Sequence, residues 1–85
     1  MHVLALSAVT DNDRFWNAMK QAHARLPAGA RWTLAIGSTD GTRAVNVIAH
    51  DSVEAVRAFL AGYADPFATT EYVEADAANA VGLPA

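Results

Sequence analysis

Trp32-Thr-Leu-Ala-Ile-Gly-Ser-Thr-Asp-Gly-Thr-Arg-Ala-Val-Asn-Val-Ile-Ala-His50 is the stretch that decides the fold. It predicts two antiparallel strands joined by a tight turn at Asp40-Gly41, because Asp-Gly between two apolar runs is a strong hairpin signal. A two-residue turn and a four-residue turn from Thr39 to Thr42 give the same pairing of side chains. The hairpin therefore fixes which residues share a face of the sheet.

One predicted face of the hairpin is apolar, because side chains alternate across a strand. The turn places Trp32 opposite Ala49 and Arg31 opposite His50. The apolar face then comprises Trp32, Leu34, Ile36, Val45, Val47 and Ala49. The other face is small, mixed and partly polar: Arg31, Thr33, Ala35, Gly37, Ala44, Asn46, Ile48 and His50. We expect helices to cover the apolar face and a second subunit to cover the mixed one.

The rest of the chain supplies two more strands and two helices. Residues 2–9 are apolar on both sides, as in a central strand. Thr10 and Asp13, and later Asp51 and Glu54, have the spacing of helix-capping boxes. The first helix would bury Phe15, Met19, Ala22 and Leu26, with Trp16, Lys20 and His23 as a neighbouring stripe, and would end at Pro27-Ala28-Gly29. The second helix would bury Val53, Val56, Phe59, Leu60 and Tyr63, and turn Glu54 and Arg57 outward.

The final elements complete an α+β domain that we expect to span residues 1–85. Residues 69–75 alternate as a last strand, and residues 76–85 form either a helical turn or an extended arm. The order β-α-β-β-α-β predicts a four-stranded antiparallel sheet with the first and third strands central and both helices on one face, the ferredoxin-like arrangement.

Composition narrows the classes of function. The chain has 85 residues, and 53% of them are hydrophobic, which is high for so short a chain and favours a partner subunit. It has no cysteine, which argues against a zinc-thiolate site. Its net charge is −3 and it has no basic stripe, which argues against nucleic-acid binding. No apolar run has membrane-spanning length, and Met1 leads directly into the first strand without a basic leader. We therefore expect a cytoplasmic protein that contacts neither membrane nor nucleic acid.

The element order, the capped segment from His50 to Phe59 and the late Glu71-Tyr72-Val73 resemble the dimeric α+β barrel superfamily over residues 2–76. This superfamily includes antibiotic-biosynthesis-type monooxygenases and muconolactone isomerases, as well as EthD-like, YCII-like and stress-responsive barrel proteins. The resemblance implies a homodimer with a site between helices and sheet or inside the barrel. The paired His and Asp expected of a YCII-like protein are not evident at a recognised spacing. Asn46 and either Trp16 or Trp32 loosely match the Asn and Trp of cofactor-free monooxygenases.

Candidate site residues follow from their chemistry. His50, beside Asp51, could act as a general base or be a half-exposed strand end. Asn46, in a central strand, needs partners from a ligand, from water or across a subunit interface. The aromatic residues Trp16, Trp32 and Tyr72 could line a pocket with Arg31, or simply pack in the core. His2, His23 and His50 are too dispersed for a metal motif, so we expect neither a metal nor a cofactor.

Two functions therefore stand as hypotheses. The first is a homodimer that binds a small apolar or aromatic molecule and carries out monooxygenase or isomerase chemistry without a cofactor. In that reaction His50 would move a proton and Asn46 would hold a carbonyl or enolate oxygen. The second is a non-catalytic binding or assembly module that uses its sheet face for dimerisation.

Overall fold

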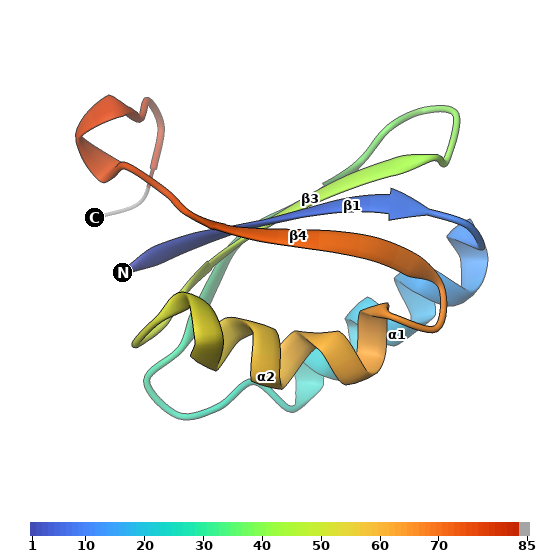
Figure 1. The fold of residues 1–85 in the computed structure, drawn as a ribbon, viewed down its shortest axis with the longest axis horizontal. Coiled ribbons are helices and arrows are strands. Elements are labelled where there is room, and N and C mark those ends of the chain that lie inside the picture. Colours follow the sequence, from blue (N-terminus) through green and yellow to red (C-terminus); the bar gives the residue numbers. More distant parts are fainter. Residues whose placement is uncertain (84–85) are drawn as a thin grey trace.

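The computed structural model describes residues 1–83 as one antiparallel sheet and two helices (Figure 1). The elements are β1 (His2–Val9), α1 (Asn12–Ala24), β2 (Arg31–Gly37), β3 (Arg43–Ala49), α2 (Val53–Ala64) and β4 (Ala68–Glu74), followed by the 3-10 turn η1 (Ala77–Asn79). The strands lie in the order β2-β3-β1-β4, so β1 and β3 are central as predicted. This is the ferredoxin-like α+β arrangement. The end of the predicted C-terminal arm, residues 84 and 85, lies outside the described residues.

Both helices begin at residues whose side chains accept a hydrogen bond from the first turn. Asp11 accepts from the backbone N–H of Arg14, and Ser52 accepts from that of Ala55. The caps therefore lie one residue after the predicted Thr10 and Asp51. An oxygen-bearing side chain is available at either position of each pair, so sequence alone leaves the choice open.

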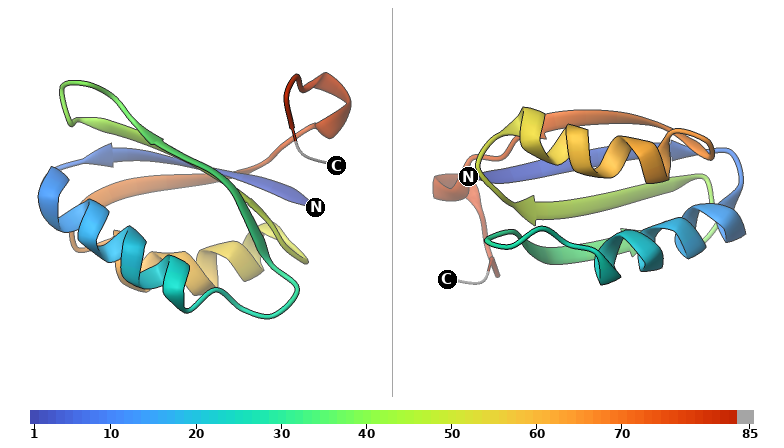
Figure 2. Two further views of the ribbon diagram at one scale, coloured as in Figure 1. Left: turned by 180° about the vertical axis from the view of Figure 1, so that it is seen from behind. Right: turned by 90° about the horizontal axis from the view of Figure 1, so that it is seen from below.

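The two helices cover the same face of the sheet, and no helix in the described part of the chain covers the other face (Figure 2). The covered side carries the small side chains of Ala5, Ser7 and Ala44 from the central strands together with the larger Val3 and Ile48, and none of these is more than 3% exposed. The large side chains of Phe15, Met19, Val56 and Leu60 enter from the helices and fill the space above them. Small sheet residues let helices approach closely, so a well-filled core results.

The structure reverses the predicted faces. The helices cover the mixed face, with Ala44, Asn46 and Ile48 buried, while the apolar face lies open, with Leu6, Leu34, Ile36 and Val73 between 36% and 56% exposed. Hydrophobicity alone suggested the opposite assignment. Side-chain volume favours the observed assignment, because Ala5, Ser7 and Ala44 leave room for the bulky side chains of the helices.

A β-bulge at Thr33 also changes the predicted register at one end of the hairpin. Leu34 to Gly37 pair with Val47 to Ala44 as predicted, but Trp32 pairs with Ile48 and Arg31 with Ala49. The extra residue moves the side chain of Trp32 from the open face to the helix side. There Trp32 packs against the core.

Candidate functional site

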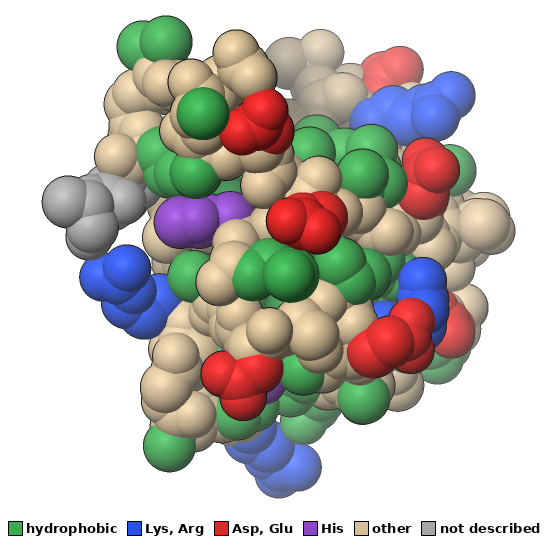
Figure 3. All heavy atoms as spheres, turned by 60° about the vertical axis from the view of Figure 1, so that its left-hand side comes forward, with side chains coloured by type: hydrophobic (Ala, Val, Ile, Leu, Met, Phe, Trp, Pro, Cys, Tyr) green, Lys and Arg blue, Asp and Glu red, His purple; other side chains and the backbone are tan. Residues whose placement is uncertain are grey.

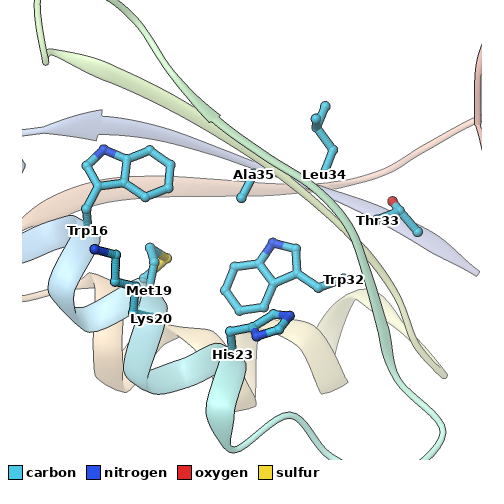
Figure 4. A pocket seen from close by; sticks show the side chains of 8 residues that line it. All are labelled: Trp16, Met19, Lys20, His23, Trp32, Thr33, Leu34 and Ala35. Carbon is cyan, nitrogen blue, oxygen red and sulfur yellow. The ribbon is translucent and has the colours of Figure 1, made fainter.

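A groove lies between α1 and the edge strand β2, with a volume of about 480 Å³ (Figure 4). Its lining combines four residues of the helix with four of the strand: Trp16, Met19, Lys20, His23, Trp32, Thr33, Leu34 and Ala35. In Figure 4, Leu34 points away from α1, whereas the two indoles stand in the space between helix and strand. The groove is thus bounded mainly by aromatic and aliphatic surface.

Trp32 forms one wall of the groove, and contacts with Asn46 and His23 hold its indole in place. Its Nε1–H donates a hydrogen bond of 3.0 Å to Oδ1 of Asn46. The imidazole of His23 lies against the indole, with ring centroids 5.7 Å apart and planes inclined by 53°. The bulge at Thr33 is what allows this placement, because regular pairing would turn Trp32 to the open face.

Trp16 forms the opposite wall, and its position depends on the absence of a side chain at Gly37. A Cβ added to Gly37 would lie 2.9 Å from Cζ2 of Trp16, which is closer than real contacts permit. On its other side, Trp16 meets Phe15 edge to face at a centroid distance of 5.3 Å. Gly37 therefore creates the space in which the indole rests against the strand.

Asn46 lies behind the groove and is completely buried. Its carbonyl oxygen accepts the Trp32 hydrogen bond, and its Nδ2 lies 3.7 Å from the Met19 sulfur, a weak acceptor. Both polar groups of this amide thus meet protein atoms. Asn46 fixes the positions of two groove residues instead of lining the groove itself.

Tyr72 occupies a different part of the helix side. It pairs with Ala5, which in turn pairs with Asn46, so a central strand separates the two side chains. Cζ of Arg57 lies 5.3 Å from the ring centroid. The hydroxyl is buried and has no hydrogen-bond partner among residues 1–83. Burial, followed by the charge of Asp65, raises the pKa of Tyr72 to about 12, while Arg57 acts in the opposite direction.

His50 follows β3 at the end of the sheet where β1 begins. Its backbone N–H donates to the carbonyl of Met1 at 2.9 Å. Its Nδ1 is buried without a hydrogen-bond partner in the described part of the chain, as is Nε2 of His2. No ion pair joins His50 to Asp51 within residues 1–83. Neither His50 nor Arg31 lines the groove.

Of the six residues predicted for a site, the structure therefore brings two into the groove and places a third behind them. Trp16 and Trp32 form its walls, and Asn46 supports one of these. The sequence had also placed Lys20 and His23 beside Trp16 on one helical stripe, which was the available signal for their role. Gly37 was missed, since nothing in the sequence shows which side chain needs the space above a strand glycine.

Neither a metal-binding cluster nor a membrane-spanning helix occurs in the described part of the chain. No group of three or more His, Cys, Asp or Glu residues within residues 1–83 is arranged to hold a metal ion. None of the helices in that range combines the length and hydrophobicity needed to cross a membrane. Figure 3, which faces the side where both termini lie, shows basic side chains scattered at the outline and acidic ones among hydrophobic groups. No basic stripe is visible on this side.

Comparison with family models, curated proteins and solved structures finds no match to this chain.

Proposed function

We propose that this protein binds a small, planar apolar or aromatic molecule in the groove between α1 and β2, and does so as a homodimer formed through the open face of its sheet. The observation that carries the binding proposal is the pair of indoles facing the same groove. Its volume of about 480 Å³ falls in the range of roughly 300–1,000 Å³ that is common for small-molecule sites.

The groove is preorganised, which favours binding. The hydrogen bond from Trp32 to Asn46 and the close fit of Trp16 over Gly37 fix both walls before any ligand arrives. A fixed wall loses little conformational entropy when a ligand binds, so more of the contact energy remains as affinity. Met19 and Ala35 add apolar surface between the walls.

We assign binding rather than a reaction to the groove. The proton-transfer hypothesis rested on His50 with Asn46 as the oxygen-holding group. His50 does not line the groove, and the polar groups of Asn46 already meet Trp32 and Met19. The titratable groups at the groove are instead Lys20 and His23, and neither is paired with a carboxylate among residues 1–83.

The proposed homodimer follows from the open face of the sheet. Leu4, Leu6, Leu34, Ile36, Val45, Val47 and Val73 share that face, and four of them are at least 36% exposed. Contiguous apolar surface of this kind marks interaction sites on soluble proteins. A second copy of the chain fits this face, because a twofold contact between two identical open faces would bury the exposed apolar surface of both.

The second candidate function is a purely structural module whose only role is assembly through this face. The same exposed apolar residues support it, and it requires nothing of the groove. The two candidates differ in one observable property: only the first expects a small molecule to bind between Trp16 and Trp32.

Nuclear magnetic resonance on the ¹⁵N-labelled chain tests the binding proposal with 2-naphthamide, a neutral planar probe. We expect the indole N–H signals of both tryptophans to shift in a saturable manner. Trp16→Ala should weaken binding, whereas Ala58→Ser, on an exposed position of α2, should not. A chain whose indole signals stay unchanged up to the solubility of the probe would leave only the assembly module.

A further inference from the structure

The groove carries positive charge without a compensating acid. Lys20 and His23 are the titratable residues among its eight lining residues, and none of the eight is Asp or Glu. Lys20 is also the single lysine of a chain with net charge −3. The charge of the groove is therefore opposite in sign to the net charge of the whole molecule.

The amine of Lys20 is available to a ligand. Two arginines on the helices are occupied locally, since Arg14 pairs with Asp11 and Arg57 with Glu54. In contrast, Lys20 has neither an ion pair nor a hydrogen bond from its side chain within residues 1–83. In Figure 4 its side chain lies beneath Trp16 and ends on that side of the groove. An apolar slot with one free cation at its rim fits a ligand that is planar at one end and anionic at the other.

We infer that the molecule held in this groove is an aromatic anion, with its ring between Trp16 and Trp32 and its carboxylate or phenolate oxygen directed to the Lys20 amine. This inference rests on the proposed binding function and specifies its ligand class. A neutral ring would use only the walls, whereas an anion also gains the attraction of the amine. A cationic aromatic molecule would be repelled by the same group.

The expected gain is modest, because Lys20 is exposed to solvent. Exposed ion pairs contribute at most about 1 kcal/mol, which corresponds to a preference of roughly three- to fivefold for the anion over its neutral counterpart. Screening by salt should reduce this preference, whereas binding through the indole walls should depend little on salt.

Calorimetric titration of the full chain with 2-naphthoate and 2-naphthamide tests this inference, since the two probes share a ring system and differ in charge. We expect 2-naphthoate to bind about three- to fivefold more tightly at low salt. Lys20→Gln should abolish the difference in affinity between the two probes, because the amide that replaces the amine carries no charge. Arg25→Gln is the matched control, because it removes an exposed cation that does not line the groove.

The single lysine offers a second readout that is specific to the site. In a chain labelled with ¹³C-lysine, one Cε signal should appear and should shift with 2-naphthoate but not with 2-naphthamide. Equal affinities of the unaltered chain for both probes would overturn the anion preference and leave the binding function standing. A preference that persists in Lys20→Gln would overturn the role of Lys20, and failure of both probes to bind would overturn the binding function itself.

Discussion

The side chain of Asn46 joins the centre of the sheet to the wall of the groove. It is completely buried, yet its best hydrogen bond goes to an indole that remains partly exposed. A buried amide without partners is costly, so this bond stabilises the fold and orients Trp32 at the same time. The sequence marked Asn46 as unusual because it interrupts an apolar central strand. It could not show that the partner would be Trp32, since a bulge decides that contact.

A double-mutant cycle measures this link. Asn46→Leu leaves the Trp32 N–H without its partner, and we expect a loss of about 1–3 kcal/mol in the free energy of unfolding. In a chain that already carries Trp32→Phe, the same change should cost less by about 1 kcal/mol, because no indole N–H remains to be orphaned. Urea titrations of the four proteins give the coupling, and strictly additive effects would show that the bond contributes nothing.

Asp40 organises the hairpin turn through its charge. Its Oδ1 accepts hydrogen bonds from the Ser38 hydroxyl at 2.7 Å and from the Thr42 hydroxyl and backbone N–H at 2.8 and 3.0 Å. These bonds lower the pKa of Asp40 from 3.8 to about 2, and the bond from Ser38 contributes most. The folded chain thus favours the ionised form, so the stabilisation is complete above pH 3.8 and is lost as the pH falls toward 2.

Asp40→Asn should remove that pH dependence. We expect the variant to be less stable than the original chain above pH 3.8, and the difference to narrow as the pH approaches 2. Comparing unfolding midpoints of the two proteins across this range isolates Asp40, because every other carboxylate is common to both. A difference that stays constant with pH would contradict the assigned role.

At the scale of elements, the helices and strands follow the sequence pattern closely, but their faces do not. Periodicity and turn residues placed β1 at residues 2–9 and the helices near their observed bounds, because such signals are local. The face that meets the helices depends on side-chain volume in both layers, which no single strand reveals. The parity of β2 depends on the bulge at Thr33, which inserts one residue without a sequence signal. The groove could not be predicted from the sequence for the same two reasons, since it requires Trp32 on the helix side of the sheet.

Two glycine substitutions separate the role of β2 from the general effect of glycine. Gly62 lies within α2 with open space around it, so Gly62→Ala should raise the free energy of unfolding by about 0.5–1 kcal/mol. Gly37→Ala should give no such gain, because its Cβ would meet Trp16 at 2.9 Å and displace the indole. It should also weaken binding of 2-naphthamide, which Gly62→Ala should leave unchanged. Calorimetry and urea titration measure both quantities, and a stabilised Gly37→Ala chain with full affinity would refute this account.

At the scale of the whole molecule, the exposed apolar face of the sheet is unfavourable for so small a protein, because its side chains remain in contact with water. A lone chain leaves 5156 Å² accessible, and a standard interface would remove about 800 Å² from each subunit, roughly a sixth of that surface. The charged residues Arg43 and Glu71 lie on the same open face, where Arg43 pairs with Ala8 and Glu71 with Leu6. Neither has an ion-pair partner within residues 1–83. In a twofold dimer, each can meet the opposite charge of the other copy, which would fix the orientation of the two sheets.

Leu6→Lys on the central strand β1 and Ile36→Lys on the edge strand β2 test the proposed dimer on this face. These side chains are 36% and 56% exposed in a single chain, so lysine at either position can reach solvent and the subunit should still fold. In a face-to-face dimer, however, the new amine would be buried against apolar surface at a cost of several kcal/mol. We expect sedimentation equilibrium to give twice the 9.0 kDa chain mass for the original protein and for the control Ala58→Lys on α2, and a single chain mass for the two face variants. Circular dichroism confirms that the variants remain folded. An original protein that stays at 9.0 kDa at high concentration would remove the dimer, while the groove and its ligand would remain to be judged by their own measurements.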